Sequence, residues 1–246
     1  MSVPFRTAVV TGASRGFGRA IAAALVAAGT TVVGIARGEQ DLRAVRDELG
    51  AGFTPIPGDA TDADLAGTVI REHRPGLLVL NAGVAPHMSP VQDQTWETFS
   101  RNWHVDTRHM FTWTTAALRE PLAAGSVVVA MSSGAALAGS PMSGGYASAK
   151  AAIRYIRGYA ADESVRAGLD IRFVTLLPQL TPATGLGSVG VAGYAARQGV
   201  DPDTFAEGLQ PILTPDQVAK AVLEIAADPH SAAEYQVSGV GSRPLD

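Results

Sequence analysis

Thr11-Gly12-Ala13-Ser14-Arg15-Gly16-Phe17-Gly18 is the stretch that decides the fold of this 246-residue chain. It lies between the apolar run Thr7–Val10, which predicts a buried strand, and residues 17–28, whose spacing predicts a helix. Glycines in such a turn let the backbone approach a pyrophosphate, and the helix that follows points its N–H groups at the anion. The stretch predicts a dinucleotide site. Because its spacing is Gly-x-x-x-Gly-x-Gly, a plain strand-to-helix turn is the alternative when no other motif accompanies it.

Apolar runs and helical patterns alternate along the rest of the chain. We expect strands at 7–10, 31–36, 53–57, 77–80, 126–131, 171–177 and 235–237, and helices at 17–28, 40–49, 62–72, 95–118, 145–167 and 215–227. Strands that are apolar throughout and separated by helices are typical of a parallel sheet covered on both faces. We therefore predict a doubly wound α/β fold in a single domain over residues 1–246, with an irregular substrate loop or lid at 178–214.

Composition excludes several classes of function. Hydrophobic residues make up 46% and charged residues 17% of the chain, the net charge is −4, and there is no cysteine. A slightly acidic chain is not expected to bind nucleic acid, and without cysteine there are no disulfides, thiolate zinc sites or cysteine nucleophiles. No apolar run is long enough to span a membrane, and the N-terminus has no signal-peptide pattern. We expect a cytoplasmic protein with no metal site.

The end of the second predicted strand bears on the cofactor. An NAD site usually has a carboxylate there for the ribose 2′-hydroxyl, whereas this chain has Ala36 followed by Arg37. Arg37 and Arg15 can grip a 2′-phosphate through their guanidinium groups. We therefore favour NADP(H) over NAD(H). The alternative is that both arginines are solvated surface residues and that the protein uses NAD.

Tyr146 and Lys150 are four residues apart on the predicted helix at 145–167, so their side chains share one helix face. An ammonium about 4 Å from a phenol stabilises the phenolate by roughly 4 kcal/mol at an effective dielectric of about 20. The pair therefore predicts a tyrosine that exchanges a proton near neutral pH. Alternatively, Tyr146 is a core aromatic residue and Lys150 a solvated one.

Taken together, the motifs resemble those of the short-chain dehydrogenases/reductases. The match comprises the glycine-rich stretch at 11–18, Asn81-Ala82-Gly83 after the fourth strand, Ser133, and Tyr146-x-x-x-Lys150, in order from residue 7 to 237. The resemblance implies a Rossmann-type fold with a parallel sheet of about seven strands. It also implies NAD(P)(H)-dependent interconversion of an alcohol and a carbonyl.

The resemblance also implies roles for individual residues. Ser133 would hold the substrate oxygen, Tyr146 would be the general acid/base, and Lys150 would hold the nicotinamide ribose. The residues expected to bind the cofactor are Gly12, Ser14, Arg15, Gly16, Phe17, Gly18, Arg37, Asp59, Ala60, Asn81, Ala82, Gly83, Tyr146, Lys150 and Pro178. Ser132 is adjacent to Ser133, but successive residues of a strand face opposite sides, so we favour Ser133.

Two departures from the family pattern are visible. Asp106 stands where the family usually has an asparagine that holds a water in a proton relay, and a carboxylate lacks the amide donors. We keep Asp106 among the expected catalytic residues. Gln179 follows Pro178 where a glycine is usual, and the threonine expected shortly afterwards is displaced to Thr181 or Thr184.

Other expectations concern partners. The resemblance implies a homodimer or homotetramer through the helices at 95–118 and 145–167. The segment at 180–213 is rich in small and apolar residues, which predicts a moderately hydrophobic substrate pocket. His87 is a candidate for the pocket mouth, and His104 and His109 are expected to pack or to lie at an interface. A different hypothesis is a non-catalytic NADP sensor on the same fold, because fold alone does not define function.

Overall fold

The predicted strands assemble into one sheet in the computed structural model, which describes residues 4–245. The sheet has eight strands in the order β3-β2-β1-β4-β5-β6-β7-β8. The strands are β1 (Thr7–Thr11), β2 (Thr31–Ala36), β3 (Phe53–Pro57), β4 (Leu77–Leu80), β5 (Val127–Met131), β6 (Arg172–Pro178), β7 (Glu234–Ser238) and β8 (Gly241–Pro244). β1 to β7 are parallel, and β8 pairs antiparallel with β7. The sequence indicated about seven strands. β8 gave no signal because its four exposed residues, Gly-Ser-Arg-Pro, include neither a β-branched nor an aromatic side chain.

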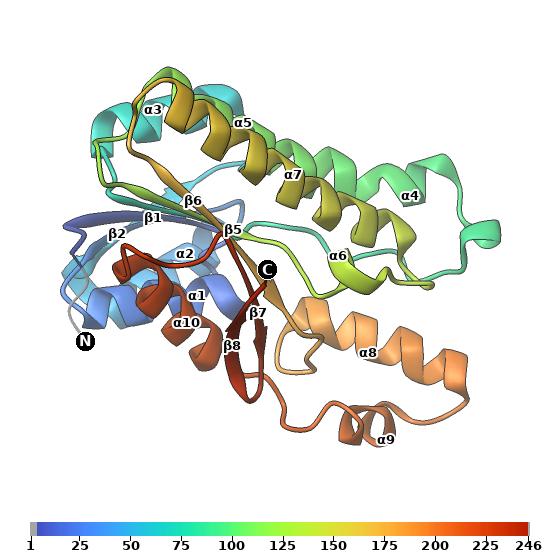
Figure 1. The fold of residues 1–246 in the computed structure, drawn as a ribbon. Helices are drawn as coiled ribbons and strands as arrows, with labels where there is room; N and C mark the ends of the chain where they lie inside the picture. Colours follow the sequence, from blue (N-terminus) through green and yellow to red (C-terminus); the bar gives the residue numbers. More distant parts are fainter. Residues whose placement is uncertain (1–3, 246) are drawn as a thin grey trace.

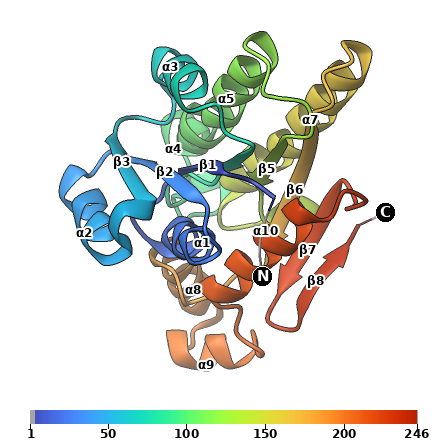
Figure 2. The ribbon, with the colours of Figure 1, turned by 90° about the vertical axis from the view of Figure 1, so that its left-hand side faces the viewer.

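Helices cover both faces of the sheet (Figures 1 and 2). On one face lie α1 (Gly16–Ala27), α2 (Glu39–Leu49) and α10 (Pro215–Ala227); on the other lie α3 (Ala63–His73), α5 (Arg108–Arg119) and α7 (Gly144–Arg166). The remaining helices are α4 (Trp96–Asn102), α6 (Ala135–Ala138), α8 (Gly185–Gln198) and α9 (Pro202–Glu207). The doubly wound α/β fold is thus confirmed. Among the described residues, no helix is long and apolar enough to cross a membrane.

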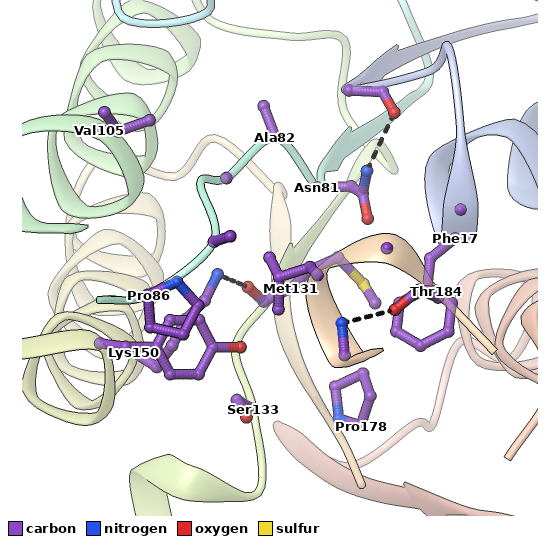
Figure 3. Close-up of a pocket in the computed structure, with 18 of the residues that line it drawn as sticks. Phe17, Asn81, Ala82, Pro86, Val105, Met131, Ser133, Lys150, Pro178 and Thr184 are labelled. Atoms are coloured by element: carbon purple, nitrogen blue, oxygen red, sulfur yellow. Dashed lines mark hydrogen bonds between the residues drawn. The ribbon is translucent and has the colours of Figure 1, made fainter. Parts of the chain in front are cut away.

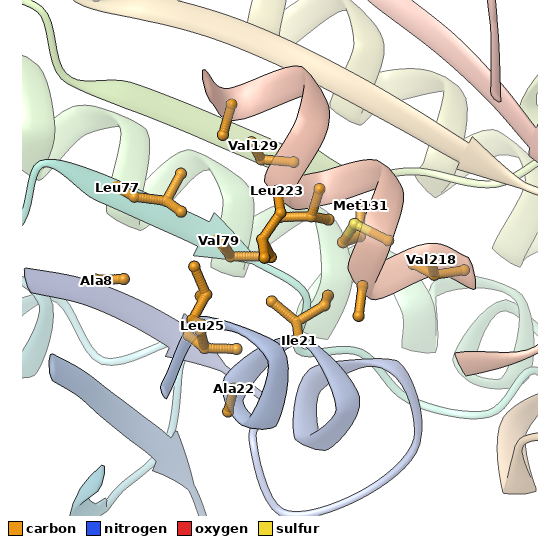
Figure 4. Close-up of a cluster of buried hydrophobic side chains, with 14 of the residues drawn as sticks. Ala8, Ile21, Ala22, Leu25, Leu77, Val79, Val129, Met131, Val218 and Leu223 are labelled. Atoms are coloured by element: carbon orange, nitrogen blue, oxygen red, sulfur yellow. The ribbon is translucent and has the colours of Figure 1, made fainter. Parts of the chain in front are cut away.

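Two hydrophobic cores, one on each face, hold the layers together. On the face shown in Figure 4, Ile21 and Leu25 of α1 pack with Val79 of β4 and Val218 of α10, all of them buried. The opposite core is centred on Trp113 of α5, which is completely buried. Burial of such side chains supplies most of the stabilisation of a domain. The packing of α1 and α10 also fixes the start of α1, where the glycine-rich turn lies.

Two segments differ from the expectation. The predicted helix at 95–118 is interrupted by a π-helical turn, Trp103–Thr107, between α4 and α5. The predicted irregular segment at 178–214 contains α8 and α9. The sequence pattern obscured α8 because Gly185, Gly187, Gly190 and Gly193 lower its helix propensity. Tertiary contacts and an N-cap stabilise it instead: the Thr184 hydroxyl accepts a hydrogen bond from the Gly187 N–H at 3.0 Å.

Candidate active site

The carboxyl ends of β1, β4, β5 and β6 open into one cleft of about 970 Å³. β1 and β4 are neighbours in the sheet, but the connections that leave them cover opposite faces, and doubly wound sheets bind ligands at such a switch point. Nearly all residues expected for the site line this cleft: Gly12, Ser14, Arg15, Gly16, Phe17, Arg37, Asp59, Ala60, Asn81, Ala82, Gly83, Ser133, Tyr146, Lys150 and Pro178. Gly18 and Asp106 are not among the residues that line it; each lies behind one that does, Gly12 and Gly83 respectively.

The glycine-rich turn has the geometry of an anion cradle. Gly12 and Gly16 have φ values of +67° and +55°, which glycine adopts without strain. Arg15, at the N-cap of α1, makes no side-chain cap, and the first turn of α1 carries no acidic residue. The N–H groups and the positive dipole end of α1 are therefore available to an anion. These residues fit the pyrophosphate of a dinucleotide.

Thr11 and Asn81 tie the ends of β1 and β4 together at the centre of the cleft. The Thr11 hydroxyl accepts hydrogen bonds from the N–H groups of Asn81 at 2.9 Å and Ala82 at 3.1 Å. In return, the Asn81 amide donates to the Thr11 carbonyl at 3.0 Å (Figure 3). These bonds hold the segment after β4 in one conformation. This agrees with the expectation that Asn81 steadies the central sheet.

One end of the cleft is lined by charged residues that follow β1, β2 and β3. Arg15 and Arg37 are exposed there, and Asp59 faces Arg37. Hydrogen bonds from Thr61 outweigh burial and, with the charge of Arg37, hold the pKa of Asp59 below its ordinary value. Asp41, in the first turn of α2, also lines this end, and its carboxylate lies beside Gly38. Asp41 lies five residues after the end of β2, so the residues directly after the strand gave no sign of this acid.

Tyr146, Lys150 and Ser133 all line the cleft. Figure 3 shows Lys150 and Ser133 away from Phe17, which lies in the glycine-rich turn. Tyr146 and Lys150 share one face of α7, and the Lys150 Nζ lies 5.5 Å from the centre of the Tyr146 ring and donates to the Met131 carbonyl at 3.1 Å. The Ser133 Oγ accepts from the Ala135 N–H at 3.2 Å. The Ser132 hydroxyl donates at 2.8 Å to the Lys150 backbone carbonyl, which leaves Ser133 as the better candidate for substrate contact.

Gly145 explains how α7 approaches the site so closely. A Cβ at this position would lie 2.0 Å from the Phe99 carbonyl oxygen of α4. Only glycine therefore permits this packing of α7 on α4, which sets the position of the neighbouring Tyr146. Tyr146 lies in the first turn of α7.

Asp106 is fully buried in the π-helical turn between α4 and α5. Its Oδ1 accepts from the Val84 N–H at 3.0 Å, and its Oδ2 lies 3.3 Å from the Lys150 Nζ. Burial works against the Lys150 ammonium, but the Asp106 carboxylate and Tyr146 outweigh it and hold the pKa of Lys150 above its ordinary value. Asp106 thus contacts the lysine directly, an arrangement that the sequence did not reveal.

His109 packs in the interior of the protein, as expected, but its position at the cleft was not predicted. It lines the cleft from α5 although it is almost completely buried, and its Nε2 has no hydrogen-bond partner among the described residues. Burial, together with the charge of Lys150, lowers its pKa to about 3, against a hydrogen bond with the Ala82 backbone. His109 is therefore neutral at cellular pH. His104 also lines the cleft, whereas the exposed His87 is not among the lining residues.

The rest of the cleft wall is formed by α8 and by the segments after β4, α6 and β6. It combines apolar side chains with two linked hydroxyls, and its residues include Pro86, Met88, Ser140, Leu180, Leu186 and Tyr194. Ser140 is hydrogen-bonded to Tyr194, whose ring stacks on Phe205 of α9 with 6.0 Å between ring centres. Neither Val189 nor Arg197 is among the lining residues. Thr181 and Thr184 line the cleft, but their hydroxyls already bond to backbone groups.

The comparisons with known proteins identify the family. Residues 6–188 match the family model for short chain dehydrogenases. The chain therefore belongs to the short-chain dehydrogenase/reductase family, a family of oxidoreductases that use a nicotinamide cofactor.

Individual relatives agree with this assignment. The chain is 30% identical over 245 residues to the cis-4-hydroxycyclohexanecarboxylate dehydrogenase of Sinomonas cyclohexanicum, covering 96% of this chain and 93% of that protein. A probable NADP-dependent dehydrogenase of Dichelobacter nodosus is 39% identical over 98 residues, which are 36% of this chain and 92% of that protein. The 3-oxoacyl-acyl-carrier-protein reductase FabG of Escherichia coli (strain K12) is 36% identical over 103 residues, 39% of this chain and 42% of that protein.

Proposed function

We propose that this protein is an NADP(H)-dependent oxidoreductase that interconverts an alcohol and a carbonyl, with Tyr146 as general acid and base. The observation that carries the proposal is the placement of the Lys150 ammonium 5.5 Å from the ring of Tyr146, at the end of a cleft that begins at the glycine-rich turn. An ammonium beside a phenol favours the phenolate. Tyr146 can then both donate and accept a proton.

Each residue of the site has a defined task in this mechanism. Bound nicotinamide supplies the hydride in reduction and accepts it in oxidation. The Ser133 hydroxyl donates a hydrogen bond to the substrate oxygen and holds it beside Tyr146. In reduction Tyr146 gives its phenolic proton to the alkoxide that forms; in oxidation its phenolate takes the alcohol proton. Lys150 stabilises the phenolate and would also hold the hydroxyls of the nicotinamide ribose.

Tyr146→Phe is the direct test. The substitution removes the proton but keeps the ring, so turnover with a panel of alcohols and carbonyls should fall by about 10²–10⁴-fold while cofactor affinity stays near that of the wild type. A variant with full activity would show that Tyr146 is not the acid–base. If the wild-type protein binds NADPH but turns over no member of the panel, the non-catalytic sensor becomes the better description.

The preference for NADP rests on Arg15 and Arg37 at the end of the cleft opposite Tyr146. A relative whose name specifies NADP gives further support. Asp41 favours the second candidate, NAD, because a carboxylate at this end repels a 2′-phosphate. We expect NADP to bind more tightly, Arg37→Asp to reverse the preference, and Asp41→Asn to strengthen it. Tighter binding of NAD than of NADP by the wild type would favour the second candidate.

The substrate end of the cleft supports a moderately hydrophobic alcohol or carbonyl compound. Met88, Leu180 and Leu186 supply apolar contacts, and the linked Ser140 and Tyr194 hydroxyls supply a polar edge. We also propose assembly into a homodimer or homotetramer through α5 and α7. Phe111, Tyr155 and Tyr159 on these helices are each at least 60% exposed, and such clusters of exposed aromatic side chains mark protein interfaces.

A further inference from the structure

Asp106 and Lys150 form a buried ion pair beside Tyr146. The Asp106 Oδ2 lies 3.3 Å from the Lys150 Nζ, and the two side chains are 0% and 6% exposed. Lys150 in turn lies beside the Tyr146 ring. The carboxylate is therefore separated from the phenol by one ammonium, with almost no solvent to screen the charges. Buried charges interact much more strongly than exposed ones.

The protein backbone fixes the orientation of this carboxylate. The Asp106 Oδ1 is held by the Val84 N–H at 3.0 Å, whereas Oδ2 faces the Lys150 ammonium at 3.3 Å. Gly83 lies against the other side: a Cβ there would come within 3.2 Å of both carboxylate oxygens. The π-helical turn at 103–107 brings Asp106 to this position, and such turns are frequent at functional sites.

Lys150 depends on Asp106 to remain charged. Burial alone disfavours an ammonium, and Asp106 is the strongest of the influences that oppose it, so that the pKa of Lys150 lies above its ordinary value. Without the carboxylate, burial would be opposed only by Tyr146. Lys150 would then lose its proton at a lower pH.

The other titratable groups around the pair do not change their charge between neutral and alkaline pH. His109 faces Lys150 from α5, and burial lowers its pKa to about 3, so it is neutral above about pH 5. Asp59 faces His109 from the loop after β3, and the lowered pKa of its carboxyl keeps it ionised. From α7, Tyr146 itself faces the lysine. Between neutral and alkaline pH, the charge at this place is therefore determined by Tyr146, Lys150 and Asp106.

We propose that Asp106 is a positioning residue: its carboxylate is the counterion that holds the Lys150 ammonium in place and sets the pH at which Tyr146 exchanges its proton. The two charges act on Tyr146 in opposite directions, because the ammonium favours the phenolate and the carboxylate disfavours it. A direct ion pair thus stands where the family's usual asparagine is placed to hold a water. The effect on catalysis rests on the proposed function of Tyr146, whereas the effect on Lys150 does not.

The charge state of Lys150 can be followed without any catalysis. The chain has two lysines, Lys150 and Lys220, so NMR signals of isotope-labelled lysine in the cofactor-free protein are assigned with one variant, Lys220→Arg. In the wild type we expect Lys150 to stay protonated beyond about pH 10.4, where a free lysine loses its proton. In Asp106→Asn we expect Lys150 to titrate at least about one pH unit earlier than in the wild type. Identical titrations would overturn the proposal. If Asp106→Asn does not fold, the wild type still tests the proposal. Loss of the Lys150 proton below about pH 10.4 would then overturn it.

The pH profile of alcohol oxidation tests the catalytic consequence. Oxidation requires the phenolate, so kcat/KM should rise with pH, and in Asp106→Asn the midpoint should move about one pH unit lower because the opposing carboxylate charge is gone. Asp62→Asn is the matched control: it removes the same charge at the N-cap of α3, where asparagine caps equally well. An unchanged or raised midpoint in Asp106→Asn would show that Asp106 does not set the pH at which Tyr146 exchanges its proton. If the wild type has no turnover, the proposed function is contradicted instead. The NMR titration then tests the role of Asp106 as counterion of Lys150 without it.

Discussion

Gly18 lies against the backbone carbonyl of Gly12, so closely that a Cβ at position 18 would be only 2.2 Å from the carbonyl oxygen. The same Cβ would come within 2.5 Å of the Asn81 amide nitrogen. Gly18 therefore does not touch the ligand space itself. It permits α1 to pack against the turn that lines the cleft, and this contact holds the turn and the segment after β4 in register.

We predict that Gly18→Ala destabilises the protein by about 1–3 kcal/mol, because the backbone has to shift to admit the methyl group. Cofactor affinity should fall as well, since the shift displaces the turn. Gly158→Ala, in α7, is the matched control: nothing lies within 4 Å of its Cβ position, and alanine there should raise stability by about 0.5–1 kcal/mol. Thermal unfolding and cofactor titration measure both effects. Equal behaviour of the two variants would contradict the close approach.

The sequence was sufficient for the features that depend on local pattern. Apolar strands, the glycine-rich turn and the spacing of Tyr146 and Lys150 are short-range signals, and the structure brings those residues to one cleft. It was insufficient where tertiary contacts decide. The π-helical turn that carries Asp106 follows no hydrophobic period, and a helix interior gives no sign that the His109 imidazole faces the cleft. Likewise, α8 forms despite its glycines because it is capped by Thr184 and packed against the cleft.

Tyr194 is predicted to control substrate affinity through its hydrogen bond to Ser140. The bond connects α8 to the loop before α7, so that the two walls of the substrate end are joined. Tyr194→Phe should lower stability by about 1 kcal/mol and raise KM, because the hydroxyl contact is lost while the stacking on Phe205 remains. Tyr235→Phe is the control, since it loses a comparable bond, from the Ala232 N–H at 2.8 Å, outside the cleft. A similar KM change in both variants would argue against a specific role.

Tyr159 is predicted to lie in a subunit interface. Its ring centre is 6.4 Å from that of Tyr155, and both side chains are about two-thirds exposed on α7. Tyr159→Glu should shift the protein toward monomers in analytical ultracentrifugation, because a carboxylate is costly to bury. Gln40→Glu adds the same single negative charge at an exposed side chain of α2 and should leave the assembly unchanged. A wild type that sediments as a monomer would rule out the proposed assembly.

Glu234 is predicted to link stability to pH through the ion pair that joins β7 to α7. Arg154 binds its carboxylate with Nε to Oε1 at 3.0 Å and Nη2 to Oε2 at 2.6 Å, and Arg157 lies 3.4 Å from Oε1. Burial alone would raise the pKa of Glu234, but the hydrogen bond and charge of Arg154, with the charge of Arg157, outweigh it and lower the pKa below 4.5. The folded state therefore binds the proton less readily than the unfolded state.

It follows that the stabilisation by Glu234 is complete above about pH 4.5 and is lost as the pH falls through the lower pKa of the folded state. Glu234→Gln should cost on the order of 3 kcal/mol at neutral pH, because two arginines lose their counterion, and the difference from the wild type should shrink in acid. Denaturant unfolding at several pH values measures this dependence. Glu163→Gln, which disrupts the exposed pair with Arg166, should leave stability nearly unchanged. A constant difference between wild type and Glu234→Gln at every pH would mean that the carboxylate charge is not what stabilises the contact between β7 and α7.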